Sequence, residues 1–197
     1  MFIMWYQTYL SIICAFSLNT LSWAQTELPY EEIPSYPSNY SEGTVISRMI
    51  DGLGYRYYWA TKNLKAKDLD FRPDTQARSI YETMEHIYDL SIMILNASKN
   101  EVNQRIDTSQ MNENELRLAT LENLKLASEK VSLINNLKDF NILFQNPLKR
   151  KTLPFWHVLN GPLADAIYHT GQIVSFRRTS GNPINPKVNV LMGKAHL

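Results

Sequence analysis

An acid and an imidazole stand four residues apart near the C-terminus, in the segment DAIYHTGQIVSFRR at residues 165–178. Four residues advance an α-helix by about 400° and about 6 Å, so Asp165 and His169 project from the same face and can meet at one ion. The same face continues to Gln172 and Phe176. Because Phe176 is apolar, this face is predicted to turn at least partly toward the protein interior.

A second histidine stands in an earlier segment with helical period. His86 shares a partly apolar line with Leu90, and two small hydroxyl residues precede it on that line, which leaves room for a ligand or water. The acids of this segment, Glu82, Glu85 and Asp89, lie on other lines and are expected to be solvated. His86 is therefore the third ligand that we predict.

Two imidazoles and one carboxylate form a ligand set that suits a divalent transition metal. Zinc and nickel fit this set best, and iron or manganese also accept it. Three protein ligands leave coordination positions open for water or substrate, which is typical of catalytic sites. We predict one divalent ion at His86, Asp165 and His169, with Tyr168 and Gln172 beside the ligands as supporting groups.

The same residues also fit structural roles without a metal. His86 fits a histidine at the edge of the core that bonds to a backbone carbonyl. Asp165 fits a first-turn acid of a helix that restarts after Pro162, and with His169 it fits a surface ion pair worth less than about 1 kcal/mol. His157 lies two turns before Asp165, about 12 Å along an unbroken helix, so it is a weaker ligand candidate.

The N-terminal segment has the features of an export signal. Residues 1–25 contain no Lys, Arg, Asp or Glu, and their apolar stretch at about 9–18 is shorter than the ~20 residues that a membrane-spanning helix needs. Ser22 and Ala24 place small residues where a signal peptidase cleaves. We predict a signal peptide at residues 1–24, a periplasmic or secreted mature chain, and no stable membrane anchor. A buried N-terminal helix is the alternative.

Cysteine and charge exclude several classes of function. Cys14, the single cysteine, lies in the predicted signal, so disulfides and cysteine catalysis are not expected and metal ligands must be His, Asp or Glu. The formal net charge is +1 with acids and bases mixed along the chain, which argues against nucleic-acid binding. The pair Arg177-Arg178 fits a solvated helix end or a contact for an anionic substrate.

Four long segments with helical period follow a proline-rich extended leader at residues 25–41. They span about 42–64, 74–98, 112–137 and 154–179. The second is predicted to start after Pro73 with Asp74 or Thr75 as its cap, and Pro162 predicts a kink or a fresh start near Leu163 in the fourth. The stripes of the first three segments are Ile46, Ile50, Leu53, Tyr57, Ala60 and Leu64; Ile80, Met84, Ile87, Ser91 and Ile94; and Leu116, Thr120, Leu124, Ala127, Val131 and Ile134.

These stripes predict an all-α fold, a four-helix bundle. Amphipathic helices of this length bury their apolar faces best against one another. Strand signals are scarce, because no sustained period-two alternation and no tight hairpin dipeptide separates the apolar runs. The connections at about 99–111 and 138–153 are long enough for crossover connections at the end of the bundle.

The motifs around the predicted ligands resemble those of the DinB-like (DinB/YfiT) superfamily of bacterial metal-binding four-helix bundle proteins. The segment LDFRPDTQARSIYETMEHI (69–87) is similar to the family's proline-led second helix with its first histidine. The segment DAIYHTGQIVSFRRTSGNP (165–183) is similar to the family's ending, in which Gly171-Gln172 is the most specific element. The likeness covers residues 42–183 and leaves 184–197 as a C-terminal tail. It implies metal ligands at His86, Asp165 and His169, with Asp165 where the family usually has a histidine.

The resemblance also implies a crossover connection, homodimers, and a metal that activates a low-molecular-weight thiol in transferases and isomerases. Because those thiols are cytosolic and this chain is predicted to be exported, we predict instead a metal-dependent hydrolase or transferase acting on a small molecule. Its metal is expected to face a pocket at the end of the bundle. No motif identifies the substrate. The alternative is a non-catalytic helical binding module with a structural or vestigial metal site.

Overall fold

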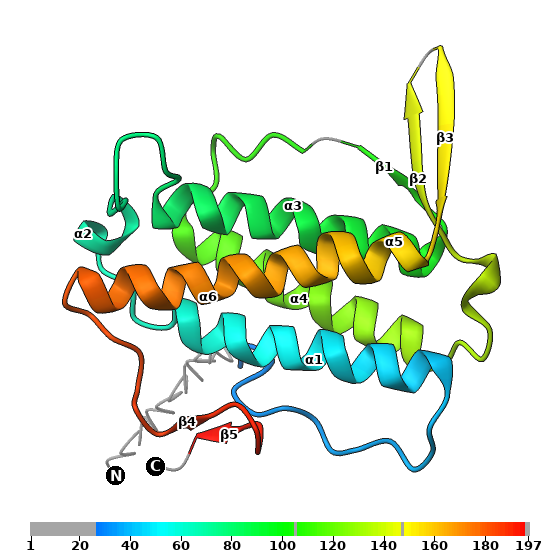
Figure 1. The fold of residues 1–197 in the computed structure, drawn as a ribbon, viewed down its shortest axis with the longest axis horizontal. Helices are drawn as coiled ribbons and strands as arrows, with labels where there is room; N and C mark the ends of the chain where they lie inside the picture. The colour runs from blue at the N-terminus through cyan, green and yellow to red at the C-terminus, as the bar shows by residue number, and fades with distance from the viewer. Residues whose placement is uncertain (1–26, 105, 147, 196–197) are drawn as a thin grey trace, which may run out of the picture.

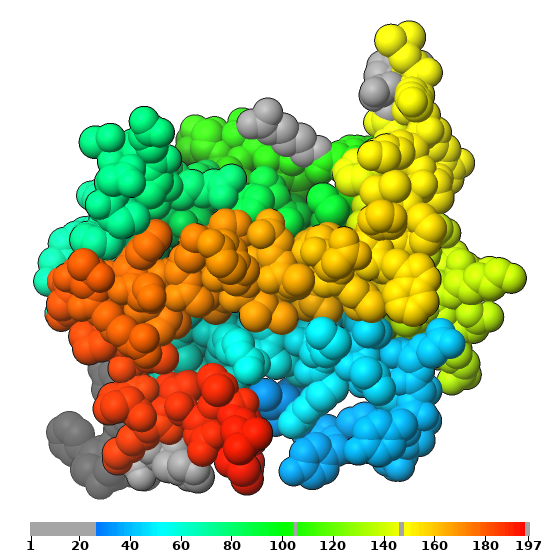
Figure 2. Space-filling view, in the orientation of Figure 1, coloured from blue at the N-terminus to red at the C-terminus, as the bar shows by residue number. Residues whose placement is uncertain are grey.

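Four long helices form the body of the protein in the computed structural model, which describes residues 27–104, 106–146 and 148–195. They are α1 (Glu42–Thr61), α3 (Ile80–Lys99), α4 (Glu113–Ser132) and α6 (Ala164–Thr179). Both α4 and α6 pack against α1 and α3, so the four helices surround one apolar core (Figure 1). Figure 2 shows α6 crossing one face of the molecule between α3 and α1. The predicted signal peptide at residues 1–24 lies outside the described residues.

The predicted apolar stripes form this core. Every stripe residue named for the first three segments is buried except Leu64, which lies beyond the end of α1 and is partly buried. Ile50, Met84 and Leu124 are fully buried and come from three different helices. Removing each such side chain from water contributes about 1.5–3 kcal/mol to folding. The packing of these stripes therefore holds α1, α3 and α4 together.

The start of α3 differs from the prediction. The helix begins at Ile80 rather than directly after Pro73, and its cap is Ser79. The Ser79 side chain accepts a hydrogen bond from the Glu82 backbone N–H at 3.1 Å, and the Glu82 carboxylate accepts one from the Ser79 N–H at 2.7 Å. This reciprocal capping box satisfies two helix-end donors at once, which neither Asp74 nor Thr75 does here.

The prediction of an all-α four-helix bundle is wrong, because the chain also builds two small sheets. Strand β2 (Asn141–Asn146) pairs antiparallel with β3 (Lys149–Pro154) and parallel with the short β1 (Val102–Asn103). This hairpin projects from the end of the helical body (Figure 1). A second sheet joins β4 (Val188–Asn189) to β5 (Lys194–Ala195). The shorter helical elements are α2 (Ala66–Leu69) and η1 (Leu137–Asp139).

The segment before α6 is irregular, as Pro162 predicted. A single turn, α5 (Trp156–Val158), leads into a π-helical segment, η2 (Leu159–Leu163), and then into α6. Gly161 within η2 has φ −98° and ψ −110°, outside the helical region. Pro162 has no N–H to donate, so the regular helical ladder is interrupted there. The predicted kink near Leu163 is confirmed.

The ends of the described chain meet beside α1. Residues 27–41 contain no helix or strand, and the Trp59 indole N–H donates to the Glu31 carbonyl at 3.1 Å. The Ile33 N–H donates to the Gly193 carbonyl at 2.9 Å, which joins this segment to the β4–β5 hairpin. Among the described residues, no helix combines the length and the apolar character needed to cross a bilayer.

Candidate metal centre

The three predicted ligands lie together between α3 and α6. His86 comes from the second turn of α3, and Asp165 and His169 come from the first two turns of α6. Nε2 of His86 lies 3.2 Å from Asp165 Oδ2, and Nε2 of His169 lies 3.4 Å from Asp165 Oδ1. One ligand atom from each residue lies within 4.8 Å of the other two. The structure therefore brings the predicted His/Asp/His group together in a geometry compatible with a metal site.

The separations between the donor atoms suit one shared cation. Around four-coordinate zinc, bonds of about 2.0–2.2 Å place neighbouring ligand atoms about 3.3–3.6 Å apart. The two His–Asp separations of 3.2 and 3.4 Å are close to this range and end on different oxygens of the Asp165 carboxylate, and one ligand atom from each of the three residues lies within 4.8 Å of the others. The two imidazole rings meet edge to face with centroids 4.6 Å apart. Both rings can therefore offer a nitrogen to one ion without stacking on each other.

Gln172 fixes the tautomer of His169. Its Oε1 lies 2.7 Å from His169 Nδ1, and because an amide oxygen only accepts hydrogen bonds, Nδ1 carries the proton. In a neutral imidazole, Nε2 then holds a lone pair that faces the Asp165 carboxylate. Two acceptors 3.4 Å apart repel each other unless a cation lies between them. The arrangement thus favours a cation between these two atoms.

The site opens to solvent on the side of the carboxylate. Side-chain exposure rises from 11% at His169 to 26% at His86 and 43% at Asp165. The charged group therefore keeps much of its hydration, whereas the neutral ring of His169 is enclosed by protein. An ion held here would have coordination positions directed toward solvent for water or a small molecule.

Tyr168 stands beside the group without bonding to it. Its ring meets the His169 ring edge to face, with centroids 5.3 Å apart, and its side chain is exposed. In the described part of the chain, its hydroxyl has no hydrogen-bond partner. Of the two residues predicted to support the ligands, Gln172 bonds directly to one of them, and Tyr168 only covers one side of a ring.

The other titratable groups of the region are engaged elsewhere. The Glu82 carboxylate caps α3 and also pairs with Arg72 at 3.3 Å, and the hydrogen bond from the Ser79 N–H lowers its pKa. The Glu85 carboxylate accepts from the Thr108 hydroxyl at 2.7 Å. His157 is exposed on α5 and is not one of the clustered residues. None of these side chains joins the ligand set.

Arg177 does not serve an anionic substrate, and this alternative is wrong for it. The residue is only 2% exposed, and its Nη1 donates to the carbonyls of Ala60 and Lys62, each at 2.9 Å. Its Nε donates to the Asn182 carbonyl at 2.8 Å. The guanidinium thus satisfies carbonyls at the C-terminal end of α1 and ties α6 to that helix. Its neighbour Arg178 is exposed.

The pocket at the end of the bundle is separate from this group. Its walls come from residues 40–46, 136–141 and 154–159, and no triad residue lines it. The expectation that the metal faces that pocket is therefore wrong. The group lies instead on the flank of the helical body, where α3 and α6 run side by side (Figure 1).

The chemistry of the donors therefore guides the functional assignment. Two neutral nitrogen donors and one anionic oxygen donor form a set that binds divalent transition metals such as zinc, nickel or iron. The Gln172 contact to His169 is the kind of outer hydrogen bond that orients metal-binding histidines. Comparisons with models of protein families, with curated proteins and with solved structures gave no match.

Proposed function

We propose that this protein binds one divalent transition-metal ion through His86, Asp165 and His169. The observation that carries the proposal is that two acceptors, His169 Nε2 and Asp165 Oδ1, face each other. Gln172 sets the tautomer of His169 that leaves Nε2 an acceptor. The resemblance to the DinB-like superfamily, which rests on motifs that contain these residues, implies the same three ligands. Zinc and nickel are the preferred ions, because imidazole nitrogen dominates the donor set.

The proposed activity is hydrolysis or group transfer on a small molecule. A divalent ion bound here would supply Lewis-acid chemistry. The chain's own contribution is to hold the two imidazoles and the carboxylate in place and to leave the solvent side of Asp165 accessible. Gln172 keeps the proton of His169 on Nδ1, so that Nε2 remains a donor to the ion.

One observation favours a second candidate, a non-catalytic module with a structural metal. In the described part of the chain, the triad's hydrogen-bond partners are its own members and Gln172, whose amide does not titrate. In that part of the chain, no titratable group outside the triad hydrogen-bonds to it, although hydrolysis usually employs a group that moves a proton. The two candidates share the metal site and differ in whether a substrate is turned over.

Elemental analysis of the full chain tests the metal site. The protein is loaded with zinc, dialysed against metal-free buffer and analysed beside His169→Ala and His157→Ala. We expect about one ion per chain in the wild type and in His157→Ala, and a clear loss in His169→Ala, because His169 is a proposed ligand and His157 is not. Metal well below one per chain in the wild type, or equal metal in all three proteins, would refute the site.

Hydrolysis and transfer assays on the same loaded protein then separate the two candidates. Turnover of a small ester or phosphoester that disappears with the metal supports the enzyme. Stoichiometric metal without turnover, together with a loss of thermal stability when the metal is removed, supports the structural module.

A further inference from the structure

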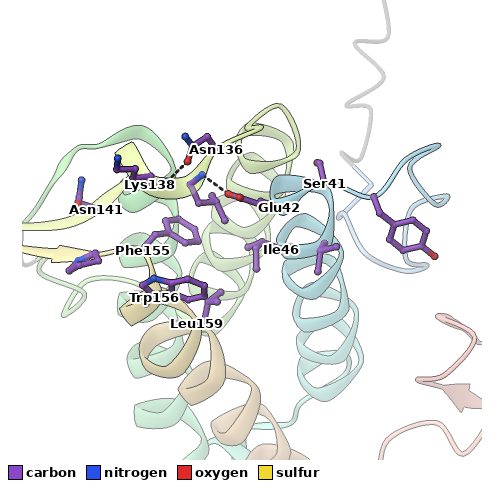
Figure 3. A pocket seen from close by; sticks show the side chains of 13 residues that line it. Ser41, Glu42, Ile46, Asn136, Lys138, Asn141, Phe155, Trp156 and Leu159 are labelled. Atoms are coloured by element: carbon purple, nitrogen blue, oxygen red, sulfur yellow. Dashed lines mark hydrogen bonds between the residues drawn. The ribbon is translucent and has the colours of Figure 1, made fainter.

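A second site lies at the end of the helical body. A cavity of ≈ 830 Å³ opens between the N-terminal turn of α1 and α5. Figure 3 shows Phe155, Trp156 and Leu159 on one side of it and Glu42 and Ile46 on the opposite side. Its volume falls within the ~300–1,000 Å³ typical of small-molecule sites. The cavity is therefore large enough for a ligand much bigger than a water molecule or an ion.

The lining combines a buried apolar floor with exposed aromatic edges. Phe155 and Ile46 are 5% and 6% exposed, whereas Trp156 is 76% exposed and Tyr40 is 98% exposed. Large aromatic side chains left open beside an apolar cavity lose water-exposed area when an apolar ligand covers them. The body of the ligand is therefore expected to be apolar.

The irregular segment before α6 keeps this space open. Because η2 interrupts the helical ladder, α5 is not a regular continuation of α6, and α5 packs against α3 and β3. Trp156 and Leu159 then stand across the cavity from Ile46 of α1 (Figure 3). The break at Gly161 thus lies between α6 and the segment that forms one wall of the cavity.

Polar side chains gather on one edge of the cavity. Asn136, Lys138 and Asn141 lie together there (Figure 3). The Glu42 carboxylate accepts a hydrogen bond from the Leu137 N–H at 2.8 Å and lies in the first turn of α1, where the helix dipole offsets its charge. Among the described residues, the Lys138 ammonium donates to none. It is therefore the cation available to a ligand at this edge.

We propose that this cavity binds a monoanionic amphiphile, an alkyl or aryl carboxylate. The apolar body lies against Phe155 and Trp156, and the carboxylate lies at the edge formed by Lys138 and the two asparagines. The Lys138 ammonium attracts an anion at this edge, and the Leu137 N–H already engages the Glu42 carboxylate there. An anion is therefore favoured over a cation or an alcohol of the same chain length. The site shares no residue with the metal group, so it does not depend on the proposed metal.

Calorimetric titration of the full chain tests the proposal. Dodecanoate, dodecanol and dodecyltrimethylammonium are each titrated below their micellar concentrations, with a chelator present throughout so that metal binding cannot contribute. We expect saturable 1:1 binding of dodecanoate, about tenfold or more tighter than that of the ammonium ligand. No saturable binding, or equal binding of the two charged ligands, overturns the proposal.

Variants locate the binding site. Val45→Trp places a large ring into the cavity, and Trp156→Ala removes an exposed wall without touching the core; each is expected to weaken dodecanoate by about tenfold. Lys138→Ala should weaken dodecanoate by about three- to fivefold and leave dodecanol unchanged, whereas Lys187→Ala, an exposed lysine outside the cavity, should change neither. Unchanged dodecanoate affinity in both Val45→Trp and Trp156→Ala would place the ligand elsewhere and overturn the assignment.

Discussion

Polar groups lie both between α1 and α4 and beside the contact of α3 with α6. The two places differ in whether a hydrogen-bond acceptor meets a donor of the protein. Between α1 and α4, the hydroxyls of Ser47 and Ser128 bond to each other at 2.8 Å. Nearby, the Tyr30 hydroxyl donates to Asp51 Oδ1 at 3.1 Å. In these two contacts the acceptor therefore meets a donor supplied by the protein.

Beside the contact between α3 and α6, two acceptors that both belong to α6 face each other. His169 Nε2 and Asp165 Oδ1 approach to 3.4 Å, and the Nδ1 proton of His169 is directed away to Gln172. A buried acid such as Asp51 is thus a poor guide to function when hydroxyl donors satisfy it. An acid such as Asp165, partly exposed and facing the lone pair of His169 Nε2, is a better guide, because a cation between the two atoms completes its surroundings.

The largest effect on stability should come from adding a side chain where α1 and the end of α4 approach most closely. A Cβ at Gly43 would overlap the carbonyl oxygens of Val131 and Ile134, which belong to backbone and cannot move aside. Gly43→Ala is expected to destabilise the protein by about 3 kcal/mol, measured by urea unfolding.

The matched control is Gly171→Ala, at an exposed position of α6. No atom lies within 4 Å of the added Cβ there, so the better helix propensity of alanine should stabilise the protein by about 1 kcal/mol. If both substitutions had the same effect, the close approach of α1 to α4 would not be a source of stability.

Removing Gln172 should have the next largest effect, and only on the metal site. Gln172→Ala leaves the Nδ1 proton of His169 without its acceptor, so zinc affinity is expected to fall by about 10- to 100-fold in competition with a chromophoric chelator. Gln172→Glu keeps an acceptor and should restore most of the affinity. Tyr168→Phe removes a hydroxyl that contacts nothing in the described chain and should bind like the wild type. Equal losses in Gln172→Ala and Tyr168→Phe would contradict the role given to Gln172.

The smallest effect concerns Asp51 and pH. Burial raises the pKa of the Asp51 carboxyl above its ordinary value of 3.8, and the hydroxyls of Ser128 and Tyr30 partly offset that rise. A raised pKa means that the folded state holds the proton more tightly than the unfolded state. The stability from Asp51 is therefore fully present below pH 3.8 and is lost as the pH rises through the folded pKa.

Asp51→Asn removes this titration. The difference in unfolding free energy between wild type and Asp51→Asn should therefore fall with rising pH above 3.8, measured by urea unfolding at several pH values. Tyr30→Phe, which deletes the donor, should extend the fall to higher pH. A difference that rises with pH would show that the folded protein favours the charged form of Asp51.

The His/Asp/His group could be predicted from the sequence because its geometry is local. Asp165 and His169 need only one turn of helix to face the same way, and His86 needs only to lie on the partly apolar side of a second helix. The apolar stripes were predictable for the same reason, since the period of a helix fixes which residues share a face. The kink at Pro162 follows from a missing N–H at one residue.

The sheets and the cavity could not be predicted because they depend on distant partners. Strand β2 shows no sustained alternation, and it pairs in parallel with only two residues of β1, some forty positions earlier in the chain. The cavity is lined by Ile46, Lys138 and Trp156 among others, and no helix or strand period relates residues so far apart in the sequence. The cap of α3 is different, since Ser79 and Glu82 form a local S-x-x-E signal that was open to recognition.

The irregular segment η2 separates α5 from α6, so the two helices face different neighbours. Gly161 lies outside the helical region, so the rotation of about 100° per residue of a regular α-helix does not continue across it. Trp156 therefore lines the cavity at the end of the helical body, whereas Asp165, beyond η2, contacts His86 of α3. The backbone conformation of this one residue, Gly161, therefore determines which neighbours the segments on either side of it contact.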